Sequence, residues 1–119
     1  MLYSIYLLIK YEKGVIMTKI TDENFENEIL SCDAALLEFY SDSCIPCKRM
    51  SPILAEVDES YPSLKVGKYN VNTDSKIAEQ YNVLASPTIV FFKNGKEADR
   101  RRGVVKKAEL EEIIKEVLQ

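Results

Sequence analysis

Two cysteines separated by two residues constrain most strongly what this chain can fold into. Cys44-Ile45-Pro46-Cys47 follows the apolar run 34–40 and precedes a helical pattern. A strand that leads directly into a helix places the pair at the helix N-terminus, where unpaired N–H groups and the helix dipole favour an anion. The thiolate is the reactive form of cysteine, so this position favours one nucleophilic sulfur at neutral pH. The second sulfur is close enough to resolve a mixed disulfide, so the pattern predicts thiol–disulfide exchange.

Hydrophobic patterning around the cysteine pair predicts an α/β fold. Strands are expected at 17–20, 34–40, 64–71, 88–92 and about 97–102. Helices are expected after Thr21, from the cysteine pair through Pro52, where we expect a kink, from Asp74, and at the C-terminus. Asn94-Gly95 is a strong hairpin signal, so the last strand should return antiparallel. The order β-α-β-α-β-α-β-β-α predicts a mixed central sheet flanked by helices on both faces.

Composition excludes several classes of protein. The 119 residues suit one domain, and 46% hydrophobic with 29% charged residues is ordinary for a globular protein. The net charge of -3 and the scattered basic residues argue against a nucleic-acid surface. Arg100-Arg101-Arg102 is interpreted as a solvated strand end. Three cysteines are too few for a disulfide-stapled scaffold; Cys32 is either a small, partly buried residue or a regulatory or dimer-forming thiol.

Residues 1–16 are interpreted separately from the domain, which is expected at 17–119. Residues 2–9 are apolar but too short to span a bilayer, and they lack the basic region and cleavage site of a signal peptide. The segment 12–16 can be encoded by a purine-rich string containing AGGAG, a bacterial ribosome-binding sequence, just before Met17. We therefore expect Met17 to be the native start and 1–16 to be a non-native leader. Codons without such a block would refute this.

Several further segments resemble the thioredoxin family from Met17 to the C-terminus. Beyond the C-x-x-C pair near a βαβ pattern, the matching segments are Phe39-Tyr40, Cys47-Lys48-Arg49-Met50-Ser51-Pro52, Lys68, Ser86-Pro87-Thr88, Phe92-Lys93-Asn94-Gly95 and Gly103. The resemblance implies a protein-disulfide reductase with no bound cofactor, working through a redox-active Cys44–Cys47 disulfide. It also implies that Cys44 is the exposed nucleophile and Cys47 the buried resolving thiol. A zinc half-site is disfavoured because the chain has no histidine and one spare cysteine.

Glu38 is a carboxylate in an otherwise apolar strand, so burial should raise its pKa into the range useful for proton transfer near pH 7. By resemblance, Glu38 takes the proton of Cys47 during resolution, and Lys68 compensates the buried charge. The alternative is that Glu38 and Lys68 form only a structural pair. The family usually carries Asp at this position, whereas the related disulfide isomerases carry Glu.

The resemblance also predicts a binding surface for the target protein. Pro87 matches the family's cis-proline, which would expose the Ser86 backbone to an extended peptide; the alternative is an ordinary trans turn. Gly103 would leave room for the substrate backbone. The family's usual Trp-Cys-Gly-Pro-Cys is here Ser43-Cys44-Ile45-Pro46-Cys47. The apolar contact surface therefore moves from before the first cysteine to between the cysteines, which affects partner choice.

The expected partners are disulfide-containing target proteins and a flavin-dependent thioredoxin reductase, for a monomeric cytoplasmic protein without nucleic-acid or membrane binding. The absence of a histidine between the cysteines favours a reductant over an oxidase. Three alternatives stay open: a redox-inactive binding subunit with the same fold, a more oxidising isomerase-like oxidoreductase, and an exported or membrane-tethered oxidoreductase anchored by residues 1–16.

Overall fold

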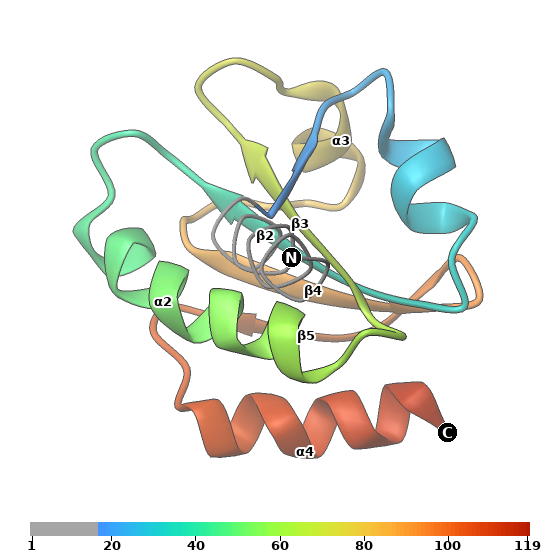
Figure 1. Ribbon diagram of the computed structural model, residues 1–119. Helices are drawn as coiled ribbons and strands as arrows, with labels where there is room; N and C mark the ends of the chain where they lie inside the picture. Colours follow the sequence, from blue (N-terminus) through green and yellow to red (C-terminus); the bar gives the residue numbers. More distant parts are fainter. Residues whose placement is uncertain (1–16) are drawn as a thin grey trace, which may run out of the picture.

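A computed structural model describes residues 17–119, so the interpretation of residues 1–16 lies outside the described residues. A five-stranded sheet forms the centre of this part of the chain (Figure 1). The elements are β1 Thr18–Ile20, η1 Glu26–Leu30, β2 Ala34–Tyr40, α2 Ile45–Ser60, β3 Lys65–Asn70, α3 Lys76–Gln80, β4 Thr88–Lys93, β5 Lys96–Arg102 and α4 Lys107–Leu118. This order confirms the predicted element sequence, and α2 continues through Pro52 without interruption.

The sheet is mixed, with strand order β1-β3-β2-β4-β5. β1, β3 and β2 run parallel, whereas β4 is antiparallel to both β2 and β5. Asn94 and Gly95 have φ angles of 51° and 79°, the left-handed geometry that a tight two-residue hairpin requires. The predicted hairpin is therefore confirmed.

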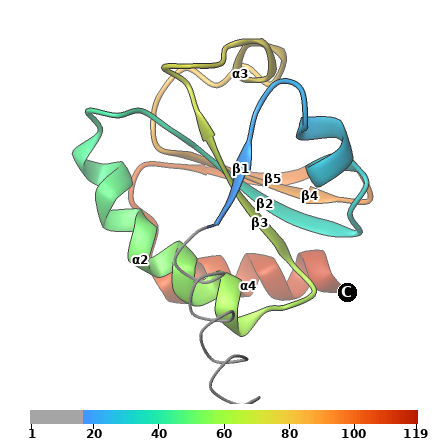
Figure 2. The ribbon, with the colours of Figure 1, turned by 45° about the horizontal axis from the view of Figure 1, so that its top comes forward.

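Helices cover both faces of the sheet, as Figure 2 shows. Because alternate residues of a strand point to opposite faces, Leu36 packs with α2 and α4, and Leu37 packs with η1 and α3. Each face carries its own hydrophobic layer. On this alternation Glu38 belongs to the face that α2 covers, which brings a carboxyl group under the helix of the cysteine pair.

The first helix differs from the prediction. The chain after Thr21 forms a turn in which Thr21 and Asn24 exchange side-chain and backbone hydrogen bonds, and the helical segment that follows is a single π-helical stretch. Asp22, directly after Thr21, accepts hydrogen bonds from the amides of Ser75, Lys76 and Ile77. Asp22 therefore binds free amides at the start of α3, a partner far along the chain that local sequence patterns do not reveal.

Gly67 on β3 lies close to the side chain of Ile20 on β1. A Cβ atom at Gly67 would lie 2.6 Å from Cγ1 of Ile20, well inside van der Waals contact. Gly67→Ala is therefore expected to lower the free energy of unfolding by about 1–3 kcal/mol, the usual cost of overpacking a core. Denaturant unfolding followed by circular dichroism measures this. The same substitution should cost less in an Ile20→Ala background; an equal cost in both would contradict the clash.

Candidate functional site

The cysteine pair lies where β2 ends and α2 begins. Cys44 is the N-cap residue of α2, and Cys44 and Cys47 form a disulfide with their Cα atoms 5.2 Å apart. The Cys47 amide donates a hydrogen bond to Cys44 Sγ over 3.1 Å. An amide that already points at this sulfur at a helix N-terminus would also stabilise a thiolate there once the disulfide is reduced.

The expectation of an exposed Cys44 is wrong for this disulfide form, in which both cysteines are buried. Cys44 is 9% exposed and Cys47 is 3% exposed. Cys44 is thus mostly covered, because its sulfur is bonded to Cys47 and receives an amide in the first helical turn. Ile45, between the cysteines, is 64% exposed and projects an apolar side chain beside the disulfide. Ser43 and Pro46 are exposed as well.

Glu38 is completely buried, and neither of its carboxyl oxygens has a hydrogen-bond partner among the described residues. Burial raises the pKa of Glu38 to about 7, and the positive charge of Lys68 only partly offsets this. The expected pKa shift is therefore confirmed. A group that ionises near pH 7 can accept or deliver a proton under physiological conditions.

Lys68 lies opposite Glu38 in the register of β2 and β3 but forms no ion pair with it within the described chain. Its ammonium instead lies over the ring of Tyr40, 4.5 Å from the ring centroid. This contact was not predicted, because the direction of a lysine side chain across a strand cannot be deduced from sequence spacing. Lys68 thus lies beside the buried carboxyl in the strand register, and its charge lowers the pKa of Glu38 without an ion pair.

The Ser86–Pro87 peptide bond is cis, as predicted. The Ser86 hydroxyl lies 3.2 Å from the hydroxyl of Ser41, next to the end of β2. Gly103 has a φ of 78°, with no atom within 4 Å of where a Cβ would stand, and its amide donates to the Pro87 carbonyl over 2.9 Å. The loops before β4 and after β5 are thus joined directly, with open space at Gly103.

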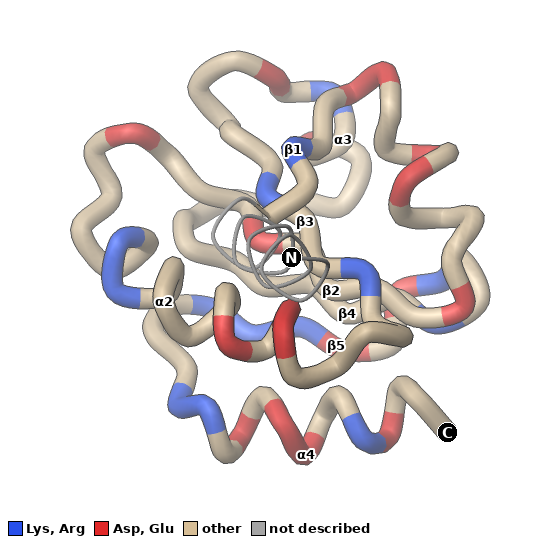
Figure 3. The backbone as a smooth tube through the Cα atoms, in the orientation of Figure 1, with Lys and Arg blue, Asp and Glu red and all other residues tan. Residues whose placement is uncertain are grey.

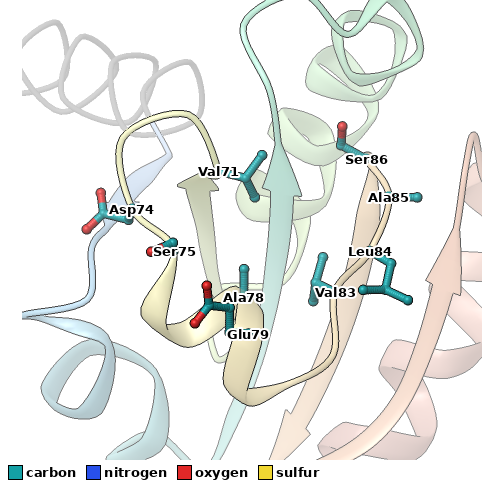
Figure 4. Close-up of a pocket in the computed structure, with 9 residues that line it drawn as sticks. All are labelled: Val71, Asp74, Ser75, Ala78, Glu79, Val83, Leu84, Ala85 and Ser86. Atoms are coloured by element: carbon teal, nitrogen blue, oxygen red, sulfur yellow. The ribbon is translucent and has the colours of Figure 1, made fainter.

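A pocket of about 190 Å³ lies beside Ser86 and was not predicted. Figure 4 shows the pocket between two segments. The β3–α3 connection and α3 form one side, and the loop before β4 forms the other. Its lining is apolar with carboxylates at the α3 side and comprises Val71, Asp74, Ser75, Ala78, Glu79, Val83, Leu84, Ala85 and Ser86. Leu84 is 88% exposed. The sequence shows a leucine two residues before the Ser86-Pro87 pair, but its exposure is visible only in the structure.

Charged residues are distributed along the chain rather than concentrated in one segment (Figure 3). Of the three consecutive arginines, Arg100 binds Glu97, and Arg101 binds Asp99 and Glu109. No group of three or more acidic, cysteine or histidine side chains in residues 17–119 could hold a metal ion. Over the same residues, no helix has the length and apolar character needed to cross a membrane.

Comparison with known proteins identifies a single family. The family model described as Thioredoxin matches residues 16–116. A thioredoxin of Chlamydia caviae is 36% identical over 95 residues, covering 80% of this chain and 92% of that protein. A thioredoxin of Rickettsia bellii is 34% identical over 99 residues, with 82% and 94% covered. A thioredoxin of Mycoplasmoides gallisepticum is 34% identical over 100 residues, with 83% and 100% covered.

Proposed function

The chain belongs to the thioredoxin family of thiol–disulfide oxidoreductases, and within that activity we propose that Cys44 is the nucleophile and Cys47 the resolving thiol. The Cys44 thiolate attacks a disulfide of a target protein, which forms a mixed disulfide and releases one target thiolate. The Cys47 thiolate then attacks Cys44 Sγ, which forms the Cys44–Cys47 disulfide and releases the second target thiolate. Two electrons pass to the target, whose two thiolates take up protons from Glu38 or from solvent.

The position of each sulfur supports this assignment. Cys44 is the helix cap, receives the Cys47 amide and is the more exposed of the two. Cys47 lies three residues further along, in the first turn of α2, and is almost fully covered. It would therefore react only after Cys44 has bound the target. The reaction needs no bound cofactor, since the disulfide itself carries the electrons.

We assign proton transfer to Glu38, with Lys68 as the charge that acts on it. Glu38 is buried on the face of the sheet that α2 covers, and its pKa is raised to about 7 by burial. Its ionised form can accept the Cys47 proton, directly or through water, when the mixed disulfide is resolved. The two carboxyl oxygens have no described hydrogen-bond partner, which leaves both able to take part.

The proposed docking surface surrounds the disulfide. An extended segment of the target would pair with the main chain at Ser86, beside Pro87, and pass the open space at Gly103. Ser43, Ile45 and Pro46 would contact it from the start of α2, and all three are exposed. The exposed side chains of Ile45 and Leu84 offer apolar contacts on two sides, in place of the tryptophan that this chain lacks.

We further propose that a flavin-dependent thioredoxin reductase regenerates the dithiol, and that the protein works as a cytoplasmic monomer. Bacterial thioredoxins are among the relatives of this chain. The family acts on disulfide-containing proteins, so the targets are proteins of that class.

The reduction potential distinguishes a reductase from an isomerase-like enzyme with the same fold. We expect the Cys44–Cys47 couple to equilibrate with dithiothreitol buffers at about -270 mV, the value typical of thioredoxin. Free thiols report the equilibrium, because the chain has no tryptophan to act as a fluorescent probe. A value of about -180 mV or higher would contradict the proposal and indicate disulfide isomerisation or formation.

A further inference from the structure

The Lys68 ammonium has two possible electrostatic partners on the same face of the sheet. Glu38 and Tyr40 are two residues apart on β2, so both side chains point to the face that α2 covers, and Lys68 lies opposite Glu38 on β3. The ammonium lies over the Tyr40 ring, 4.5 Å from its centroid, and makes no ion pair with Glu38. Both Glu38 oxygens are buried without a hydrogen-bond partner in the described chain.

We propose that Tyr40 is a positioning residue, whose ring holds the Lys68 ammonium away from the Glu38 carboxyl so that Glu38 can still carry a proton. The proposal rests on the proposed role of Glu38 in resolving the mixed disulfide. It assigns to the Tyr40 ring, rather than to its hydroxyl, the function of setting how strongly Lys68 acts on the buried acid.

The physical basis is a competition for one cation. A cation over an aromatic ring is stabilised by the negative face of the π-system, and the half-buried Lys68 keeps part of its hydration in that position. Without the ring, the Glu38 carboxylate is the oppositely charged group opposite Lys68 in the strand register, while β1 places the like charge of Lys19 on the other side. An opposite charge in contact with a carboxylate lowers its pKa by about 1–3 units. A Glu38 lowered in this way would be a weaker base for the Cys47 proton.

The other groups around Glu38 do not replace Lys68 in this competition. β4 places the uncharged Ile89 opposite Glu38. The buried residues of α2, which covers this face, carry no charge either: Cys47, Met50, Leu54 and Val57. Among residues 17–119, the charge that lowers the pKa of Glu38 is that of Lys68. The Tyr40 phenol has a raised pKa, through burial first and then the charges of Asp42 and Glu38, so it stays neutral over the range in which Glu38 titrates.

Titration of the Glu38 carboxyl in the oxidised, full-length protein tests the proposal without any turnover. The readout is the side-chain carboxyl ¹³C resonance of labelled glutamate, assigned by its loss in Glu38→Gln. We expect Tyr40→Leu to lower the Glu38 midpoint by about 1 unit or more. Tyr40→Phe is the matched control, because it keeps the ring and removes only the hydroxyl, and it should leave the midpoint near that of the wild type.

A double variant separates the position of Lys68 from a general loss of packing. In Lys68→Met the ammonium is absent, so adding Tyr40→Leu should no longer lower the midpoint. An unchanged midpoint in Tyr40→Leu, or an equal drop with and without Lys68, would overturn the proposal. Thermal melting checks that each variant folds, and Tyr40→Met serves in place of Tyr40→Leu if the latter does not. Failure of the proposed catalytic role would appear in reductase assays and leave this titration unaffected.

Discussion

Replacement of Cys44 by serine is expected to reduce disulfide reductase activity to the rate of the dithiol buffer alone, whereas replacement of Cys47 should stop the reaction halfway. Cys44→Ser removes the nucleophile, and the loss should exceed about 10³-fold, in line with the loss of a nucleophile in other enzymes. Cys47→Ser keeps a reactive Cys44 but has no thiol to resolve the mixed disulfide. The variant should therefore accumulate covalently bound to its target.

Turbidity from the reduction of insulin measures the first effect, and non-reducing electrophoresis with mass spectrometry measures the second. Cys32→Ser is the matched control, since Cys32 is half-buried, forms no disulfide and lies outside the site. It should keep wild-type activity. Trapping by Cys44→Ser instead of Cys47→Ser would reverse the assignment. Full biological activity of a Cys44→Ser/Cys47→Ser double variant would instead favour a redox-inactive binding subunit.

Glu38→Leu should stabilise the protein at high pH and change its stability little at low pH. The pKa of Glu38 is about 7 in the folded state, because of burial, against 4.5 for an unperturbed glutamate. Below pH 4.5 both the folded and the unfolded state hold the proton. Between pH 4.5 and 7 the folded state binds more protons than the unfolded state, so stability falls as the pH rises. Above pH 7 the full penalty, on the order of 3 kcal/mol, remains.

Urea unfolding of both proteins at pH 4 and pH 8 measures this difference. The gain on replacing Glu38 by leucine should be about 3 kcal/mol larger at pH 8 than at pH 4. Glu59→Leu is the control, because Glu59 is an exposed glutamate near the end of α2, and its effect should not change with pH in this way. A gain of equal size at both pH values would contradict this, because it would mean that ionisation of Glu38 does not lower the free energy of unfolding.

The same Glu38→Leu variant should resolve the mixed disulfide more slowly, although it is more stable at high pH. Without the carboxylate, the Cys47 proton has no internal acceptor, so release of the target should slow by about 10²-fold, the lower range for loss of a general base. Rapid-quench measurement of the mixed disulfide shows this directly.

Local sequence signals were sufficient wherever the deciding interactions lie close along the chain. The β-branched and aromatic residues of 88–92 and the Asn94-Gly95 turn predicted β4 and its hairpin, and the apolar surroundings of Glu38 predicted its raised pKa. The segment after Thr21 was predicted less well, because Asp22 bonds to amides more than 50 residues away. The contact between Lys68 and Tyr40 depends on side-chain direction across two strands, and the pocket beside Ser86 depends on how α3 packs, which spacing does not reveal.

The bond from the Gly103 amide to the Pro87 carbonyl limits how freely the exposed edge of the sheet can be redesigned. It follows directly after the last β4–β5 register pair, Thr88 with Arg102. Substitutions that fray β5 would therefore loosen the support of the loop that carries the cis-proline, even where they touch neither cysteine. In protein engineering, β5 should therefore be treated as part of the support of the redox site. Tags, labels or surface charges that disturb β5 would also disturb the loop that carries Pro87.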